Sequence, residues 1–498
     1  MRSSVWWIGC SVFFLLCGPG CSEEGPSGPM GGAGGMPECT VAADCNDGDE
    51  CTIDACIEGI CDNPVANDGF FCGGGYCQSG VCEPLTSLYS CNEEGLLEAV
   101  AAGGGPHGFD CDGEQTITTT EEIIVGNDVI LDGLGNLTVS GGGTHRVFVI
   151  NSVDAQLWRL TVSGGLGDDG GGIQAKFGST LGLASAEVSG NTADFNGGGI
   201  FAEGGGRLTL TDSTVSGNTA RFGGGGIMSY KPISLTRSTV SGNAAGNDGG
   251  GVWCAPGGLT LTVTDSVISA NAVSDGNGGG IASDTLIMTN STVSTNSVST
   301  QGGGVFCRDA TIIGSTFSEN SANTDGGAFA NLGMVTVTNS TFSANTAGQS
   351  GGALLNLGDM SLLHVTLSDN GAPNGRAVAT GGALSFRNTL VDGDCNIVGS
   401  PSVVSAGNNI ESPGNSCRLT QESDQVDVTR DELNLAALAD NGGPTQTHAL
   451  LTGEDIEIDG SVAIDAVPSE SCGEDEDQRG VRRPSGEGCD VGAYELLQ

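Results

Sequence analysis

The chain has 498 residues, of which 87 are glycine and only 15% are charged. Its 60 acidic residues against 16 Lys and Arg give a formal net charge of −44, which repels phosphate backbones and argues against nucleic acid as a partner. So much glycine with so few charges is unusual for an ordinary globular enzyme. The composition fits an acidic extracellular surface.

The N-terminus has the pattern of an export signal. Arg2 precedes the apolar run VWWIGCSVFFLLCG, which is too short to cross a bilayer as a helix. The small residues and Cys21 that follow resemble a bacterial lipoprotein signal, which implies cleavage and lipidation at Cys21. A plain secretory signal with an incidental cysteine is the alternative. Either way, residues 1–20 are a signal peptide and the protein is exported, to the outer-membrane surface or beyond the cell.

A tether and a cysteine-rich module follow. Residues 21–38 are rich in Gly and Pro and predict a flexible tether. Residues 39–83 contain eight cysteines and too few apolar residues for a core. We therefore expect disulfides to stabilise this module in place of a hydrophobic core, with the pairing left open. The CNDGDECTIDAC portion resembles the short cysteine repeats of extracellular matrix proteins. Four aspartates here are candidate calcium ligands, and ordinary solvated turns are the alternative: Asp44, Asp47, Asp49 and Asp54.

Cysteine usage indicates an oxidising compartment. Apart from Cys10, Cys17 and Cys21, sixteen cysteines remain. Sequence neighbours predict the bridges Cys91–Cys111, Cys395–Cys417 and Cys472–Cys489. The full set of disulfide candidates is Cys39, Cys45, Cys51, Cys56, Cys61, Cys72, Cys77, Cys82, Cys91, Cys111, Cys395, Cys417, Cys472 and Cys489.

Residues 85–122 contain the clearest helical segment. The stretch SLYSCNEEGLLEAVAAGGG begins at Ser87, places Leu96, Leu97 and Val100 on one face, and ends at Gly103. Because it directly precedes a repeat array, we expect this helix to cap the open end of that array.

A unit of about 25 residues recurs over residues 123–394. One marker is the apolar residue after each glycine cluster, and a second is the Asn that closes each VSGN-like unit. Two markers with one period predict a solenoid. The first set is Ile173, Ile200, Ile227, Val252, Ile281, Val305, Phe329, Leu354 and Leu384. The second set is Asn191, Asn218, Asn243, Asn271, Asn296, Asn320, Asn345 and Asn370.

The units predict strands. Apolar residues alternate, as at Leu208 and Leu210, and β-branched residues are frequent. Helical repeats would need longer stretches at period 3.6, which glycine-rich units cannot supply. About three short strands per turn, joined by Gly and Asn corners, give a parallel β-helix. We expect the stacked Asn side chains to hydrogen-bond from turn to turn.

Two resemblances extend this interpretation. The units VSGN, FSEN and FSAN, with GGGI, GGAF and GGAL, resemble the repeats of polymorphic outer-membrane proteins, within the pectate-lyase-like group. This resemblance implies a right-handed β-helix. The strings LADNGGPTQTHALL, GSVAIDA, DEDQRGVRRP and CDVGAYE resemble the choice-of-anchor Q domain of bacterial surface proteins. This second resemblance implies that residues 395–498 serve placement on the cell surface. We expect a lipid at Cys21, in place of a C-terminal anchor, to hold the protein at the membrane.

Catalytic residues are not identified. A lyase needs calcium-binding aspartates with a basic residue, and a pectin hydrolase needs an acidic pair. The cations of the repeats share no face, and the strings GHG and RxK are absent. Asp168 and Asp169 form the best carboxylate pair, but a DDG string is typical of a turn.

The histidines and the tail offer weaker candidates. His364 in LLHVTL is expected to point outward, and His448 to have a structural role, while His107 and His145 lack spaced metal-binding partners. In the tail, a buried ion-pair network is predicted, and catalytic acids are the alternative. Its members are Asp465, Arg479 and Asp490.

Cys254 and Cys307 are predicted to stay reduced. Each follows a marker residue by two positions, which places both in one column with Ser283 in the turn between them. Two turns correspond to roughly 9–10 Å, which exceeds the reach of a disulfide. We expect both thiols to fill the core.

The sequence therefore predicts an all-β protein: a right-handed parallel β-helix with an N-terminal helical cap, preceded by a disulfide-rich module. The predicted function is a non-catalytic cell-surface or secreted protein, adhesive or envelope-structural. Its expected partner is an extracellular or cell-surface glycan or protein, and it needs no cofactor unless calcium binds the module. The alternative is a β-helix that binds or degrades polysaccharide.

Overall fold

The computed structural model describes residues 87–453 and 460–498, together with residues 45, 51, 52, 55–57, 60–62, 71, 72, 75–78 and 81–85. The chain forms two units, Met1–Glu83 and Pro84–Gln498. The signal peptide, the tether with Cys21, and the four candidate calcium aspartates lie outside the described residues.

The smaller unit is built from short antiparallel strands and disulfides. Strands β1 (Ala55–Ile57) and β2 (Ile60–Asp62) form a hairpin, and β3 (Phe71–Cys72), β4 (Gly75–Gln78) and β5 (Val81–Pro84) form a sheet. The bridges Cys45–Cys61, Cys51–Cys77 and Cys72–Cys82 are present. Buried sulfur atoms make up the described core of this unit, as expected for a module with few apolar residues.

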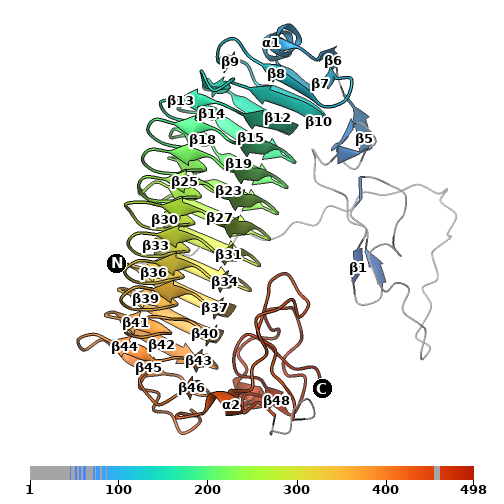
Figure 1. Cartoon of the computed structure of the whole chain (residues 1–498). Coiled ribbons are helices and arrows are strands. Elements are labelled where there is room, and N and C mark those ends of the chain that lie inside the picture. Colours follow the sequence, from blue (N-terminus) through green and yellow to red (C-terminus); the bar gives the residue numbers. More distant parts are fainter. Residues whose placement is uncertain are drawn as a thin grey trace, which may run out of the picture. The chain divides into compact units, whose positions relative to one another are not determined.

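The larger unit is a right-handed parallel β-solenoid (Figure 1). Each turn contributes strands to four stacked rows, which we call faces A, B, C and D in chain order within a turn. Every row pairs residue by residue with the same row of the next turn, as Ile200 pairs with Ile227. Strands form because inward apolar residues alternate with outward Thr and Ser, and glycine ends each turn.

The rows have the following members. Face A contains β9 (Ile123–Val125), β11 (Phe148–Ile150), β14 (Ile173–Ala175), β18 (Ile200–Ala202), β22 (Ile227–Ser229), β26 (Val252–Cys254), β36 (Phe329–Asn331), β39 (Leu354–Asn356), β41 (Val378–Thr380) and β44 (Cys395–Ile397). Face B contains β6 (Ser87–Ser90), β7 (Gly104–Asp110), β15 (Thr180–Ala184), β19 (Leu208–Thr211), β23 (Ile233–Thr236), β27 (Thr260–Thr264), β42 (Ala383–Arg387) and β45 (Val403–Ser405). Face C contains β8 (Gln115–Thr118), β16 (Glu187–Ser189), β20 (Thr214–Ser216), β24 (Thr239–Ser241), β28 (Val267–Ser269), β31 (Thr292–Ser294), β34 (Thr316–Ser318), β43 (Leu390–Asp392) and β46 (Ile410–Ser412).

Some strands continue round a corner, and face D is narrow. Strands β30 (Ile281–Thr289) and β33 (Val305–Ile313) run through faces A and B. Strands β10 (Val129–Ser140), β12 (Asp154–Ser163), β37 (Met334–Ser343) and β40 (Asp359–Ser368) run through faces B and C. Face D contains β13 (Leu166–Gly167), β17 (Thr192–Ala193), β21 (Thr219–Ala220), β25 (Ala244–Ala245), β29 (Ala272–Val273), β32 (Ser297–Val298), β35 (Ser321–Ala322) and β38 (Thr346–Ala347).

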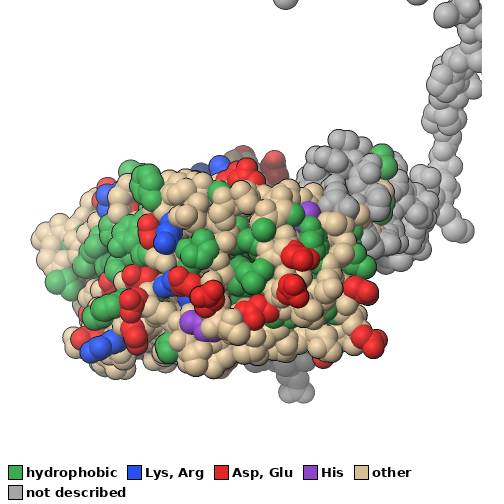
Figure 2. Space-filling view, turned by 90° about the horizontal axis from the view of Figure 1, so that it is seen from above, with side chains coloured by type: hydrophobic (Ala, Val, Ile, Leu, Met, Phe, Trp, Pro, Cys, Tyr) green, Lys and Arg blue, Asp and Glu red, His purple; other side chains and the backbone are tan. Residues whose placement is uncertain are grey.

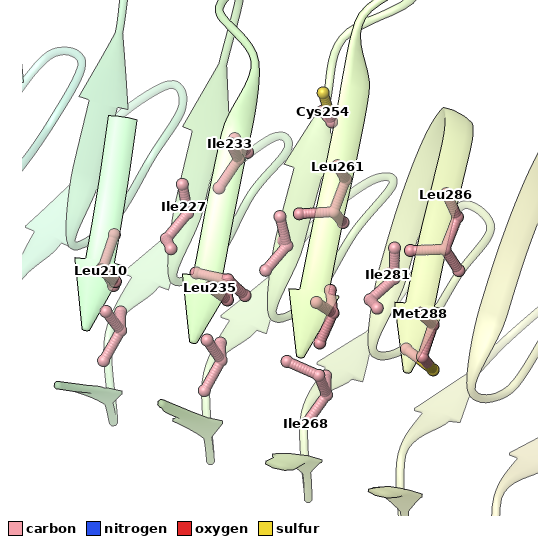
Figure 3. Packing of buried hydrophobic residues seen from close by; sticks show 14 of the residues in the cluster. Leu210, Ile227, Ile233, Leu235, Cys254, Leu261, Ile268, Ile281, Leu286 and Met288 are labelled. Atoms are coloured by element: carbon pink, nitrogen blue, oxygen red, sulfur yellow. The ribbon is translucent and has the colours of Figure 1, made fainter. Parts of the chain in front are cut away.

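The core is a column of aliphatic side chains between the faces. Figure 3 shows Leu235 and Leu286 of face B, and Ile227 and Ile281 of face A, turned into this interior, and all four are fully buried. The predicted marker register holds from Ile173 to Leu354 and then fails. Val378, not Leu384, pairs with Leu354, and Leu384 belongs to face B.

The corner between faces B and C repeats one backbone conformation. One residue per turn has a left-handed φ, between 44° and 56° for the non-glycine members. A single residue with positive φ bends the chain from one face to the next, and strands such as β10 and β37 continue through this corner. From β10 onward the column contains Leu134, Arg159, Ser185, Asp212, Arg237, Asp265, Asn290, Gly314, Asn339, His364, Asn388 and Asn408.

Helix α1 (Glu93–Ala102) begins and ends as the sequence implies, but it is shorter than predicted. The Asn92 side chain accepts a hydrogen bond from the Gly95 N–H and starts the helix, so the preceding Ser87–Ser90 is free to form strand β6. Leu96 and Val100 are buried in the main core, whereas Leu97 is 48% exposed on the outer side. The predicted apolar face was therefore wrong at Leu97.

The solenoid is longer than the repeat pattern indicated. It includes β7 before residue 123 and continues through β46, which ends at Ser412, beyond residue 394. Residues 413–498, which we call the tail, contain α2 (Arg430–Leu433), β47 (Val467–Pro468), the 3₁₀ turn η2 (Ser469–Ser471) and β48 (Gly488–Cys489). The tail folds back along face C of the last turns (Figure 1).

Candidate functional site

The asparagine column is a structural ladder. Each Nδ2 from Asn191 to Asn345 donates to the Oδ1 of the next asparagine at 2.9–3.0 Å, and the same Oδ1 accepts the N–H of the preceding asparagine. Nδ2 also donates to a face C carbonyl, as Asn271 does to Val240. The residues are buried and their amides bond within the protein, so the ladder holds the corner between faces C and D.

The two interior thiols lie as predicted. Cys254 and Cys307 are unpaired and fully buried, and Ser283 separates them in one column. Burial raises the pKa of Cys254 to about 12 and also raises the pKa of Cys307. These thiols stay protonated at neutral pH and are poor nucleophiles.

The three predicted neighbour disulfides are present in the larger unit: Cys91–Cys111, Cys395–Cys417 and Cys472–Cys489. The first joins the segment before α1 to the end of β7. The others close loops near and within the tail.

Carboxylates at the corners mainly hold backbone. The Asp169 Oδ1 atom accepts hydrogen bonds from Asn196 N and Nδ2 at 3.1 and 3.0 Å, while Asp168 is exposed. Asp284 accepts the Gly257 and Gly258 N–H groups, which lower its pKa because they stabilise the charged form. The DDG pair is therefore part of a turn.

Two histidines attach the tail to the solenoid. His364 does leave the solenoid interior, because it occupies the left-handed corner, but the tail covers it completely. Its ring faces the carbonyl oxygens of Cys472 at 2.6 Å and Gly492 at 3.3 Å, and burial lowers its pKa to about 3. His448, also buried, bonds Ala436 O and Ser343 Oγ. The expectation that His364 points outward from the solenoid is confirmed, and the sequence did not indicate that the tail covers its ring.

The predicted cap network has different partners. Arg479 pairs with Asp477 at 2.7 Å and Arg483 pairs with Glu495 at 2.8 Å, and these four side chains are nearly or fully buried. Asp490 instead accepts the N–H groups of Asp465 and Leu496, and burial raises its pKa to about 7. Asp465 accepts from Gly488 N and Gln498 Nε2.

One buried cation was not identified from the sequence. Lys231 has no exposed surface, and its ammonium donates to the carbonyl oxygen of Ser179, two turns away. Burial lowers its pKa to about 8, although Glu203 and Asp154 partly oppose this. The amine is covered by protein, so it is positioned to bridge turns and not to meet a ligand.

A group of aromatic rings beside face A was also missed. We call it the aromatic surface, defined as Phe177, Phe195, Phe222, Tyr230 and Trp253. Phe177 is 71% exposed, Tyr230 47%, Phe195 46% and Phe222 39%. This exposure stands out in a chain with only 5% aromatic residues, because exposed apolar groups that cluster commonly mark binding sites.

The register of face A brings these rings together. Phe201, Met228 and Trp253 are the central, outward residues of three consecutive strands. Tyr230 packs against Phe201 at 6.1 Å between ring centroids. Phe201 and Met228 are buried beneath the exposed rings. Aligning the residue after each marker would have revealed this column, and Phe195 and Phe222 each follow an asparagine marker by four positions. Phe177, in contrast, lies in a loop without a repeat signature.

Comparison with known proteins supports the fold. Residues 123–298 match the family model described as "Right handed beta helix region". This segment runs from β9 to β32 and includes the aromatic surface. No curated protein and no solved structure matches the chain. The similarity supports a β-helix and does not assign a reaction.

Proposed function

We propose that the protein is a non-catalytic, exported β-helix that uses the aromatic surface for adhesion at the cell surface. The observation that carries this proposal is the clustering of exposed rings on a scaffold whose interior is a regular, fully paired solenoid. Exposed rings gain most when a partner removes them from water. A rigid solenoid suits adhesion because it holds them at fixed spacing.

The polar groups of the described residues favour binding over catalysis. The corner carboxylates hold backbone N–H groups, and two of the four histidines are fixed between the tail and the solenoid. The strongly shifted Lys231 is enclosed by protein. A general acid or base must reach the reacting atoms, whereas the carboxylates beside the rings, Glu203 and Asp169, accept hydrogen bonds from neighbouring groups of the protein.

Surface placement rests on the resemblance of the tail to choice-of-anchor Q domains and on the lipoprotein-like signal. In the part of the chain that the structure describes, no helix is both long and apolar enough to cross a bilayer. On the basis of the lipoprotein-like signal, we assign attachment to a lipid on Cys21. The buried ion pairs join segments of the tail to each other, and hydrogen bonds to Thr341 and Thr366 hold the tail against face C.

The test combines labelling and adhesion. Wild-type protein and Cys21→Ala are compared by metabolic labelling with a palmitate analogue and by protease accessibility on intact cells. We expect lipid labelling and surface exposure only for the wild type, with Cys21→Ala released to the medium. Cells that display the wild type should attach to a target surface more strongly than cells lacking the protein. Equal attachment would overturn the adhesive function.

A further inference from the structure

The geometry points to a neutral polysaccharide as the ligand of the aromatic surface. This inference rests on the proposed adhesive function and specifies its ligand. It requires rings that present open faces, contacts that continue along the solenoid, hydrogen-bonding groups near the rings, and a charge that rejects other polymers.

The rings lie on glycine backbone. Ring carbons of Phe177 are 3.5 Å from where a Cβ of Gly204 would be and 4.0 Å from that of Gly205. A Cβ at Gly223 would collide with the Trp253 ring. Both rings therefore pack directly against the chain of a neighbouring turn. Because backbone covers one side of Phe177 and 71% of the residue is exposed, its other side is open to a ligand.

The contacts continue along the solenoid axis. Phe195 and Phe222 occupy the same corner in consecutive turns, where the Phe222 N–H donates to the Phe195 carbonyl. Their rings stack with centroids 5.9 Å apart and planes inclined by 5°. A ligand made of repeated rings can use one contact per turn. A chain-like polymer fits this arrangement better than a single small molecule, which would need an enclosing pocket.

Hydrogen-bonding groups lie beside the rings. Glu203 is half-buried and lies in the turn between the turn of Phe177 and the turn of Tyr230. Its carboxylate accepts hydrogen bonds from Gln174 Nε2 at 3.1 Å and from Phe177 N at 3.2 Å. On the other side, the Asp169 carboxylate is held by Asn196. A sugar ring has an apolar C–H face and a rim of hydroxyl donors. It therefore matches aromatic rings bordered by carboxylate and amide acceptors.

Charge excludes the other polymers. Lys176 and Arg221 are near the rings, but the acidic residues Asp168, Asp169 and Glu203 oppose them locally, and the whole chain carries −44. Figure 2, which looks onto the end nearest α1, shows carboxylates spread over the visible surface. This field repels polyuronates, nucleic acids and anionic membranes.

An extended peptide is a poorer fit. Peptides that bind sheets add a strand to a free edge, but each strand of face A from β18 to β26 already pairs on both sides. Recognition would then depend on side chains alone. A neutral polysaccharide needs no free strand edge.

The test uses the full chain purified from the producing cells. Binding to insoluble cellulose, chitin and xylan is measured by depletion, with polygalacturonate as the acidic comparison. The variants are Phe177→Ala/Tyr230→Ala and Phe195→Ala/Phe222→Ala. The matched control is Met334→Ala/Leu357→Ala, which removes side chains that are 65% and 48% exposed on other turns. Far-UV circular dichroism and Tm verify the fold.

We expect the wild type to bind at least one neutral polysaccharide, with little effect of salt because the ligand is uncharged. Each aromatic double variant should bind at least tenfold more weakly, which is about 1.4 kcal/mol, and the control should bind like the wild type. If a double variant does not fold, binding by the single variant Phe177→Ala tests the inference. This ring is largely exposed, so its removal should not affect folding.

Three results would overturn the inference: no binding to any neutral polysaccharide, tighter binding to polygalacturonate, or unchanged binding by the aromatic variants. Adhesion of cells that display the protein separates this failure from that of the proposed function. Adhesion without polysaccharide binding removes only the ligand assignment. Absence of adhesion by wild-type cells removes the adhesive function itself.

Discussion

Replacing one residue in the middle of the asparagine ladder tests the physical basis of the solenoid. In Asn271→Ala, four hydrogen bonds disappear: two accepted by Oδ1, from Asn243 N and Nδ2, and two donated by Nδ2, to Val240 O and Asn296 Oδ1. The site is fully buried, so water does not replace these partners. At about 1 kcal/mol for each bond, we expect the free energy of unfolding to fall by about 4 kcal/mol.

The assay has a global and a local readout. Urea denaturation followed by far-UV circular dichroism gives the change in stability of the full chain. Hydrogen exchange at the Asn243 amide reports the loss of its acceptor, which is the Oδ1 atom of Asn271. The matched control is Asn323→Ala, which changes an exposed asparagine and should alter stability by less than about 0.5 kcal/mol.

The ladder interpretation has a clear point of failure. If Asn271→Ala and Asn323→Ala cost similar amounts, and the Asn243 amide exchanges as in the wild type, the amides are not important for stability. Glycine corners and the aliphatic core would then be sufficient to hold the turns together.

Three further perturbations test the buried polar groups. Between pH 8 and 10.5 the unfolded chain binds a proton at Lys231 that the folded chain does not. As the pH rises through this range, this group should therefore add up to about 3 kcal/mol to the wild-type free energy of unfolding. Lys231→Met should lack that increase in urea titrations, and parallel pH profiles of the two proteins would contradict the burial of the amine. Cys254 and Cys307 should resist a thiol reagent in the native protein and react in guanidinium, and peptide mapping that found them joined would refute the register. Arg483→Met should leave the buried Glu495 carboxylate without its cationic partner. This should lower the free energy of unfolding by about 3–5 kcal/mol and make the tail susceptible to proteolysis. The exposed neighbour Arg482 supplies the control Arg482→Met, and equal proteolysis of both variants would argue against the pair.

The repeat could be recognised from the sequence because its signals are local. Alternation of apolar residues defines strands, and the Gly and Asn corners recur at each turn. The marker prediction failed in the turn where the glycine cluster is interrupted. Arg376 stands where earlier turns have a glycine before the marker, so the next glycine pair led to Leu384 as the predicted marker in place of Val378. In the structure Gly375 still has a left-handed φ of 65°, and one glycine is enough for the turn.

The sites that depend on distant residues could not be predicted in this way. The tail contains many acids, and nothing local distinguishes Asp477 and Glu495, which pair with arginines, from Asp465 and Asp490, which hold backbone. Likewise, Phe177 and Tyr230 belong to turns two apart, and the register of face A brings both beside Gly204 of the turn between them.

The tail covers face C and its corner with face B in the later turns, whereas the aromatic surface lies beside face A in earlier turns. In earlier turns this corner carries charges, as in the exposed pair Arg237–Asp212. Covering such a pair would remove water from two charges, and this desolvation penalty can exceed the energy of their attraction. In later turns the corner is neutral: Asn339 donates to Glu476 O, and Asn388 donates to Cys472 O.

The exposure of face C also differs between earlier and later turns. Thr316, Thr341 and Thr366 are buried under the tail and hydrogen-bond to it, whereas Thr239 and Thr292 of earlier turns remain partly exposed. The charged corner residues Asp212, Arg237 and Asp265 lie in turns before those that the tail covers. The corner residues that hydrogen-bond to the tail, Asn339, His364 and Asn388, are neutral polar residues. A ligand can therefore bind the aromatic surface without displacing the tail.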